Sequence, residues 1–326
     1  MRSYFLNIFI ILVVITFIGI IFEYRITIKK NYFLSVTDRF YSGNKSFLKN
    51  DAFSKFILYP TDLCNLNENK NETNNTSLFI IFAYMMVRLD NFERRNSIRE
   101  SWANRTLFPN LRLGFIVGKS NDEKINNLIR EESLKYKDII QGDFLDTYRN
   151  LTYKSLVAWK WIINYCSHAK LIVKIDDDIA LNSNYLIKYF NINSHNSTIQ
   201  NKTFYCDVCR GCHPIREKDS KWHASFEEYN EKIYNLTGYP TFCFGPSYSM
   251  SPDLVNSLYE ASFKVKFFWL EDVYTGLLAR YVQNINHEST SSKYTDLSGV
   301  INRKDFILVR YVNSNNDHRN LLKYVY

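Results

Sequence analysis

A strand that ends in three consecutive aspartates is the feature that most constrains this chain. Residues 171–173 are apolar, as in a buried strand, and residues 174–178 read Lys-Ile-Asp-Asp-Asp. Neighbouring carboxylates repel one another, and a divalent cation is the usual means of holding them together. Ligands of α/β sheets bind at the carboxyl ends of strands. The motif therefore predicts a metal site for a phosphate-bearing substrate, and the alternative is an acidic loop tip.

Alternating apolar runs and amphipathic segments predict an α/β fold. We expect strands at 78–84, 111–117, 139–140 and 171–175, and helices at 94–102, 122–136, 151–166 and from residue 185 to 190. Alternation with short links favours a mostly parallel sheet flanked by helices. The segment 191–234 is polar and irregular, and is interpreted as a substrate-facing insertion.

The amino terminus predicts a membrane anchor. Residues 4–22 are almost entirely apolar, and nineteen helical residues nearly span a bilayer core of roughly 30 Å. Residues 1–3 would form a cytosolic tail, and the polar, Asn-rich stretch at 23–76 is interpreted as a stem before a folded domain at 77–326. A local count of positive charges would reverse this orientation. Nine Asn-x-Ser/Thr sequons favour a lumenal domain instead.

Charge and cysteine content narrow the classes of partner. The net charge is +8, but the basic residues are scattered, so no nucleic-acid partner is expected.

Six cysteines are compatible with an oxidising compartment. The run Cys206-Asp-Val-Cys209-Arg-Gly-Cys212-His213 contains a c-type haem pattern and invites a zinc interpretation. Disulfides among these three, Cys64, Cys166 and Cys243 are the favoured prediction.

A second acidic pair follows an aromatic run. Glu271 and Asp272 come directly after Phe-Phe-Trp-Leu at 267–270. Acids set against aromatic side chains lose solvation, which raises their pKa and suits a general base. The alternative is the first turn of a helix, where the helix dipole favours acids.

Taken in order, these segments resemble the β-1,3-glycosyltransferase family of the β-1,3-galactosyltransferases, the β-1,3-N-acetylglucosaminyltransferases and, more distantly, the Fringe proteins. The blocks that carry the resemblance are 94–102, 115–118, 138–154, 174–178, 239–251 and 271–276. The resemblance implies a GT-A-like nucleotide-sugar-binding fold. It also implies inverting transfer of galactose or an N-acetylhexosamine from a UDP-sugar to a glycan acceptor on protein or lipid, usually with Mn²⁺. The anchor and stem resemble those of single-pass type II proteins of the Golgi membrane, with a lumenal catalytic domain.

The resemblance also assigns roles to residues. Asp178, with Asp176, would hold the metal, and Asp177 would lie beside the nucleotide. Asp272, next to Glu271, would deprotonate the acceptor. Three basic residues match motif positions on the donor side: Arg95, Arg99 and Lys154.

The chain departs from the family pattern at two places. Gly245-Pro246-Ser247 replaces a glycine-rich run, and Arg310 stands where a histidine is expected at the metal, with His318 eight residues further on. Proline removes a backbone donor, and an arginine could replace cation charge at the diphosphate. Two alternatives therefore remain: an inactive lumenal glycan-binding or chaperone-like protein on the same fold, and a metal-dependent phosphohydrolase. The oligomeric state is not predicted.

Overall fold

The central sheet has eight strands and is mixed. In the computed structural model, which describes residues 55–65, 80–192, 197–234, 236–300 and 304–321, the strand order is β1-β4-β3-β2-β5-β8-β7-β9. Their bounds are β1 Phe56–Leu58, β2 Ile81–Met86, β3 Leu111–Lys119, β4 Ile139–Leu145, β5 Leu171–Asp176, β7 Thr203–Cys209, β8 Phe242–Met250 and β9 Asn286–Ser289.

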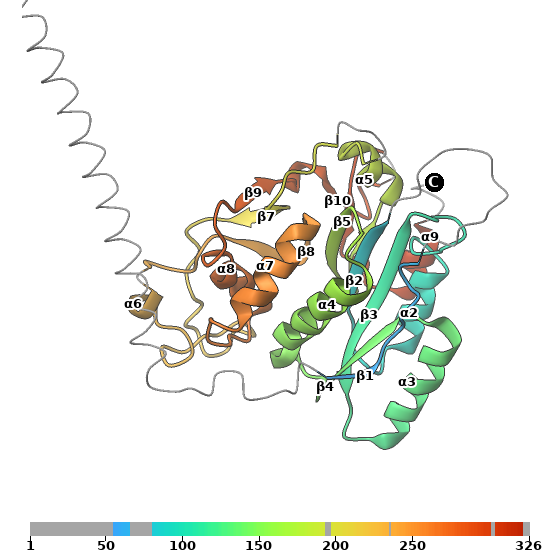
Figure 1. Cartoon of the computed structure of the whole chain (residues 1–326), viewed down its shortest axis with the longest axis horizontal. Coiled ribbons are helices and arrows are strands. Elements are labelled where there is room, and N and C mark those ends of the chain that lie inside the picture. Colours follow the sequence, from blue (N-terminus) through green and yellow to red (C-terminus); the bar gives the residue numbers. More distant parts are fainter. Residues whose placement is uncertain (1–54, 66–79, 193–196, 235, 301–303, 322–326) are drawn as a thin grey trace, which may run out of the picture. The chain divides into compact units, whose positions relative to one another are not determined.

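The predicted parallel arrangement is confirmed for one half of the sheet. Strands β4, β3, β2 and β5 run parallel, and β2 lies between β3 and β5 (Figure 1). Every residue of β2 is buried, which explains its continuous apolar sequence. Beyond β5 the pairing changes, because β8 is antiparallel to both β5 and β7. The sheet is therefore mixed rather than mostly parallel.

The segment 191–234 is more ordered than its polar sequence predicts. It contributes β7, which pairs with β8 and β9, and the short helix α6 (Glu231–Tyr234). The first four residues of β7 are all buried, because β8 and β9 pair with the strand on either side. Apolar and polar residues therefore do not alternate along it.

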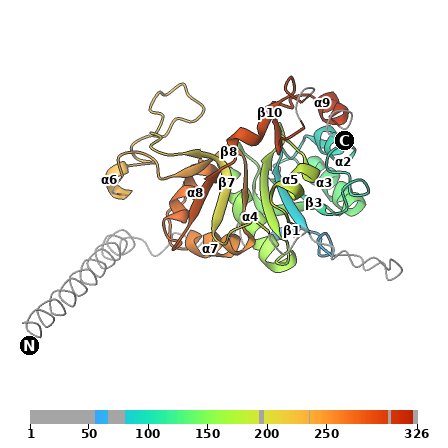
Figure 2. The same cartoon turned by 90° about the horizontal axis from the view of Figure 1, so that it is seen from above.

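Helices cover both faces of the sheet. Helix α4 (Leu151–Tyr165) and α7 (Pro252–Ser262) lie on one side, and α2 (Phe92–Arg99) and α3 (Glu123–Tyr136) lie on the other (Figure 2). Helix α8 (Glu271–Ala279) packs against β8, α4 and α7. The remaining helical segments are α5 Ser183–Tyr189, α9 Asn315–Asn320, and the 3₁₀ turns η2 Tyr148–Asn150 and η3 Ser291–Lys293.

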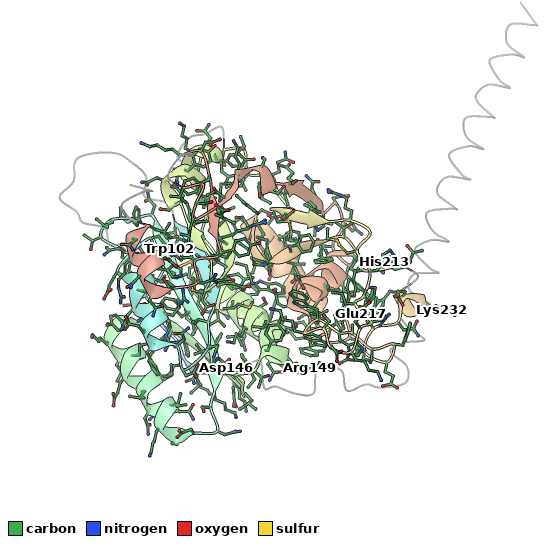
Figure 3. All side chains as sticks on the ribbon, turned by 180° about the vertical axis from the view of Figure 1, so that it is seen from behind. Trp102, Asp146, Arg149, His213, Glu217 and Lys232 are labelled. Carbon is green, nitrogen blue, oxygen red and sulfur yellow. A yellow bond between two sulfur atoms is a disulfide. The ribbon has the colours of Figure 1, made fainter. Side chains whose placement is uncertain are left out.

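The carboxyl-terminal segment closes against the acidic motif. A second sheet joins β10 (Tyr294–Asp296), β11 (Leu308–Arg310) and β6 (Ala180–Leu181), and β6 follows directly on the three aspartates. Helix α9 packs on α2, and Figure 3 shows Trp102, just beyond α2, beside it. The Trp102 indole N–H donates to Nδ1 of His318 at 3.2 Å.

The folded unit begins before Ser77. Strand β1 pairs antiparallel with β4, and a disulfide joins Cys64 to Cys166 at the end of α4. All described residues fall within the unit 50–326. The polar tract after Cys64 predicts a stem that ends at residue 76, but β1 lies before this tract and already belongs to the sheet. The predicted tail and anchor, and the stem outside residues 55–65, lie outside the described residues. No helix within the described ranges is long and apolar enough to cross a membrane.

All six cysteines form disulfides. The pairs are Cys64–Cys166, Cys206–Cys243 and Cys209–Cys212. The favoured prediction from the sequence is confirmed. The haem and zinc interpretations are wrong, because both need thiol sulfurs that these bonds consume.

Candidate active site

The acidic motif lies at the point in the sheet where the strand order reverses. The chain passes from β2 to β3 on one side, while β5 lies on the other side of β2, and such a switch point is where open α/β sheets bind ligands. Asp176 ends β5 and is level with Met86, the last residue of β2. The loop after β2 therefore approaches the aspartates, and the Asn91 side chain donates to Asp177 at 3.5 Å.

Backbone contacts from the carboxyl-terminal segment fix the aspartate turn. The Val312 N–H donates to the Asp178 carbonyl at 2.7 Å, and Nε2 of His318 lies 3.0 Å from the Asp177 carbonyl. His318 is fully buried, and burial lowers its pKa to about 4, so the ring is neutral. Trp102 donates to Nδ1, so Nε2 carries the proton and donates to Asp177. These contacts hold the three carboxylates at the end of the strand.

Lys174 connects the aspartates to β8. Its side chain is 3% exposed, and Nζ lies 2.5 Å from Asp176 Oδ1 and also donates to the Gly245 carbonyl. Burial raises the pKa of Asp176 to about 7, although Lys174 opposes the change. A buried ammonium between an acid and a carbonyl is an expensive arrangement that needs both partners.

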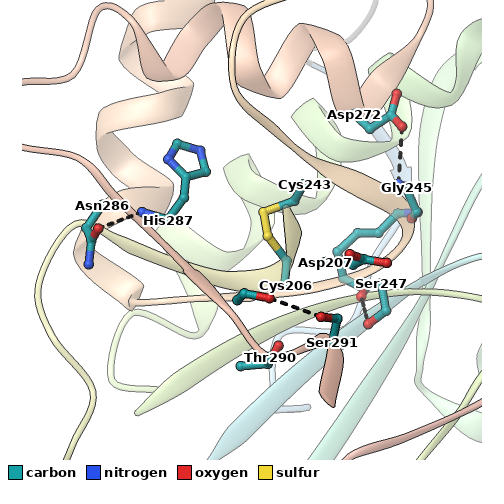
Figure 4. Close-up of a disulfide and its surroundings, with 12 residues drawn as sticks. Cys206, Asp207, Cys243, Gly245, Ser247, Asp272, Asn286, His287, Thr290 and Ser291 are labelled. Atoms are coloured by element: carbon teal, nitrogen blue, oxygen red, sulfur yellow. Dashed lines mark hydrogen bonds between the residues drawn. A yellow bond between two sulfur atoms is a disulfide. The ribbon is translucent and has the colours of Figure 1, made fainter. Parts of the chain in front are cut away.

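Asp272 lies on the other side of Gly245. Its Oδ2 accepts the Gly245 N–H at 3.1 Å and its Oδ1 accepts the Val273 N–H at 2.8 Å, in the first turn of α8 (Figure 4). Burial raises the pKa of Asp272 to about 6, the adjacent Glu271 raises it further, and the two N–H donors and Lys174 oppose this. Gly245 thus binds Lys174 through its carbonyl and Asp272 through its amide, which brings Asp176 and Asp272 to one place.

The backbone of Gly245 lies close to the Asp272 side chain. A Cβ built on Gly245 would lie 3.2 Å from Asp272 Oδ2, tighter than most real contacts of that kind. The amide that binds Asp272 belongs to Gly245 itself, so Pro246 removes a different donor. The departure from the glycine-rich pattern therefore leaves this contact intact.

Glu271 has a different environment from Asp272. It is 5% exposed and accepts hydrogen bonds from Tyr248 at 2.7 Å and from Ser155. The Tyr248 hydroxyl lies 3.1 Å from the Tyr84 hydroxyl, which accepts the Trp159 N–H at 3.0 Å. Successive helical residues point in directions about 100° apart, which gives the two acids different partners, although the charge of Glu271 still raises the pKa of Asp176. Glu271 anchors the first turn of α8 in the core and positions Asp272.

Both arginines that are predicted on the donor side form ion pairs with other residues. Arg95 is fully buried and pairs with Glu132 at 2.6 Å. Arg99 pairs with Glu132 at 2.7 Å and with Asp138 at 2.8 Å. These contacts fasten α2 to α3 and to the start of β4, so the structure does not bring either guanidinium to the aspartates. We assign them a structural role in place of the expected donor contact.

Lys154 lies closer to the aspartates. Its Nζ is 2.9 Å from Asp146 and donates to the Val87 carbonyl at 2.7 Å, at the end of β2. Burial lowers its pKa, while Asp146 and the more distant Asp177 raise it. Lys154 therefore fixes the loop between β2 and the aspartates, with 2% of its surface exposed.

The donor set fits a hard divalent cation. Magnesium and manganese ions commonly take one or two carboxylates and complete their shell with substrate phosphates. The Asp176 side chain is 36% exposed, and Asp178 is partly exposed. Within the described ranges, no three His, Cys, Asp or Glu residues are grouped to hold a metal by themselves. Phosphate oxygens would therefore have to complete the shell.

Comparison with known proteins identifies the family. The galactosyltransferase family model matches residues 93–290. β-1,3-Galactosyltransferase 1 of human and of mouse is 31% identical over 261 residues, which cover 76% of this chain and 78% of the relative. Mouse β-1,3-galactosyltransferase 2 is 36% identical over 189 residues, which cover 57% of this chain and 43% of the relative. The chain belongs to the galactosyltransferase family. It is therefore a glycosyltransferase, and the phosphohydrolase alternative is replaced.

Solved structures match this chain only weakly. One is a glycosyltransferase involved in glycosylation of the major capsid of PBCV-1, with 7% identity and a TM-score of 0.39 over 75% of this chain and 98% of that one. Another is the galactosyltransferase LgtC, with 7% identity and a TM-score of 0.36 over 74% of this chain and 95% of that one.

The residues that depart from the family pattern have clear partners. Arg310 pairs with Asp207 on β7 at 2.9 Å, and its guanidinium lies 4.7 Å from the centre of the Tyr294 ring. Its charge is already balanced. His318 binds the backbone of Asp177 and has no contact with the carboxylates themselves.

Sequence reasoning missed several contributors to the site. Lys174 stands within the aspartate motif and Gly245 within the block 239–251, and neither position by itself indicates a link between the two acids. The one signal for Lys174 was a cation inside an otherwise apolar strand. Two exposed aromatic residues beside the site, Tyr148 and Trp222, were not singled out.

Proposed function

We propose that this chain is an inverting β-1,3-glycosyltransferase that moves galactose or an N-acetylhexosamine from a UDP-sugar to a glycan acceptor. The link Asp176–Lys174–Gly245–Asp272 carries the proposal. It sets an acidic cluster suited to a nucleotide diphosphate beside a separate carboxylate with the properties of a base.

Asp272 is the proposed base. A pKa of about 6 leaves the carboxylate mostly ionised at neutral pH while making it a stronger proton acceptor than an ordinary aspartate. The Gly245 and Val273 amides fix both oxygens without neutralising them. Asp272 takes the proton of the acceptor hydroxyl as that oxygen attacks the anomeric carbon.

The donor side is assigned to the aspartate turn. Asp176 and Asp178 would hold Mn²⁺, which supplies positive charge for the diphosphate, and Asp177 lies beside them. As the new bond forms, the bond from the anomeric carbon to the UDP oxygen breaks and its electron pair leaves with UDP. A single displacement with base and leaving group on opposite sides inverts the anomeric centre.

The structural observations do not favour an inactive protein. That alternative depended on Arg310 and Pro246. Arg310 is paired with Asp207, and the amide that binds Asp272 is present.

Product analysis tests the proposed reaction. The purified full chain is incubated with UDP-galactose or UDP-N-acetylglucosamine, Mn²⁺ and benzyl glycosides of N-acetylglucosamine and galactose. We expect UDP and a β-1,3-linked product by NMR. An α-linked product would exclude inversion, and an absence of product with all donors would reject the function.

We also propose that residues 4–22 anchor the protein in the Golgi membrane, with residues 77–326 in the lumen. The apolar run, the sequons and the three disulfides support this placement. Peptide N-glycosidase treatment of the chain from secretory-competent cells should lower its apparent mass. An unchanged mass together with a cytosolic fractionation profile would contradict the placement.

A further inference from the structure

Two large aromatic side chains are exposed beside the catalytic carboxylates. Tyr148 in η2 is 47% exposed and Trp222 in the loop 214–229 is 48% exposed. We call this pair the aromatic rim. Neither residue has a role in the proposed chemistry, and exposed aromatic residues that are grouped together commonly mark a binding surface.

Lys221 lies close to both rings of the rim, because its Nζ is 5.7 Å from the centre of the Tyr148 ring and 4.7 Å from that of Trp222. The electrostatics of Tyr148 agree with this placement. Burial raises the pKa of Tyr148, a hydrogen bond with the Trp222 side chain lowers it, and the charges of Asp272 and Asp176 raise it. The charges of Asp272 and Asp176 thus act on Tyr148, whose ring also lies 6.1 Å from that of Trp269, three residues before Asp272. Two segments that are more than seventy residues apart meet at this point.

Neighbouring side chains hold the aromatic rim in place. The Tyr148 ring lies 6.1 Å from the Trp269 ring, and the Arg149 guanidinium lies 4.3 Å from Trp269 and pairs with Glu228 of the same loop. Figure 3 shows Arg149 and the loop residue Glu217 on the same side of the molecule. Nζ of Lys221 lies 4.7 Å from the Trp222 ring centre. The rim is therefore largely formed before a ligand arrives, which reduces the entropy lost on binding.

Two buried polar groups nearby lack partners. Nε1 of Trp269 and the hydroxyl of Tyr239 make no hydrogen bond within the described residues, although the two residues are only 5% and 8% exposed. The Tyr239 hydroxyl also lies in the field of Asp272. Unsatisfied buried donors are rare and call for a missing partner. Both atoms are covered by protein, so they belong to the wall behind the rim and not to its exposed surface.

We propose that the aromatic rim binds the acceptor sugar, with the apolar face of a pyranose ring against Trp222 and Tyr148. This inference rests on the proposed function. The acceptor is favoured over the donor because the diphosphate site is on the aspartate turn, whereas the rim joins η2 and the loop 214–229 near the base. The sugar edge remains free to bind Lys221, whose ammonium already lies at the rim.

Kinetics on the full chain test the proposal. Trp222→Ala is compared with Trp222→Phe, which keeps an aromatic face. The matched control is Phe263→Ala, which removes an equally exposed ring (47%) at the end of α7. We expect Trp222→Ala to raise the KM for the benzyl glycoside acceptor at least tenfold, Trp222→Phe to restore most of it, and Phe263→Ala to change it less than twofold.

Binding measurements separate the possible failures. UDP titrated with Mn²⁺ should bind wild type and Trp222→Ala equally, and weaker UDP binding would mean that Trp222 contacts the nucleotide, which overturns the proposal. An unchanged acceptor KM would also overturn it. If wild type transfers no sugar, the proposed function fails. Saturation-transfer NMR with the same benzyl glycosides then decides the inference, which holds only if Trp222→Ala abolishes the signal.

Discussion

Two influences act in opposite directions on the pKa of Asp272. The first turn of α8 and two backbone amides favour its charge, but burial beside Glu271 disfavours it, and burial dominates. The result is a carboxylate with a pKa of about 6, between those of an ordinary aspartate and a histidine. This has consequences for both pH dependence and stability.

Activity should fall on the acid side of neutrality. As pH drops through about 6, Asp272 becomes protonated and can no longer accept the acceptor's proton. We expect kcat/KM, measured at saturating Mn²⁺, to be about tenfold lower at pH 5 than on the plateau. A flat profile between pH 7.5 and 5 would show that no carboxylate with this pKa limits the reaction.

The same carboxylate should destabilise the fold at neutral pH. Its pKa is raised above the unfolded value of about 3.8, so the folded state favours the protonated form, and the cost of ionising it appears as pH rises from 3.8 to about 6. Relative to Asp272→Asn, which carries no charge there, wild type should therefore lose roughly 1–2 kcal/mol of unfolding free energy between pH 4 and pH 7.5, after a discount for partial exposure. The comparison is of pH dependence, because asparagine has one acceptor oxygen and leaves one of the two amides, of Gly245 or Val273, without its acceptor at either pH. Urea titrations at the two pH values measure it, and an equal pH dependence of the two proteins would contradict this explanation of the pKa.

At the scale of elements, the sequence predicts those strands and helices whose pattern is local. The buried run that became β2, the strand β5 and the helix α4 were all expected, because continuous apolar runs and helical periodicity are visible in one sequence. Strand β8 was not expected. It contains Gly245, Pro246 and two serines, and it exists because β5 and β7 pair with it on either side. Such pairing is a tertiary effect that overrides local propensity.

The long-range disulfide should matter more for stability than the short-range one. Cys64–Cys166 closes a loop with a sequence separation of 102, whereas Cys209–Cys212 closes one with a separation of 3. In the chain-entropy model these correspond to about 4–5 and about 2 kcal/mol. Replacing the first pair by alanine should lower the midpoint of denaturant unfolding clearly more than replacing the second. The reverse order would show that strain or residual structure dominates over loop length.

At the scale of the whole molecule, the sequence predicted the acids of the site and misassigned some of its cations. Asp176 and Asp272 come together as expected, about a hundred residues apart in sequence. Arg95 and Arg99 occupy motif positions, yet their partners Glu132 and Asp138 are far enough along the chain that no local pattern reveals them. A motif specifies which residues occur together but not which neighbours already neutralise them.

The proposed metal dependence would be a property of the assembled site. Two carboxylates are assigned to the metal, and His318 binds the backbone of Asp177, so most of the remaining ligands must come from the donor and water. We expect transfer to stop in EDTA and to return with Mn²⁺, and Asp178→Asn to need at least tenfold more Mn²⁺ for half-maximal rate. Full activity in EDTA would show that protein cations alone stabilise the diphosphate.

The central claim is that one site holds a nucleotide at the aspartate turn while Asp272 acts on a different substrate. The most direct measurement is the paired determination of kcat and UDP affinity for Asp272→Asn. The account predicts a loss of kcat of at least a thousandfold with a UDP Kd within twofold of wild type. Near-normal turnover, or a loss of UDP binding that matches the loss of turnover, would contradict it.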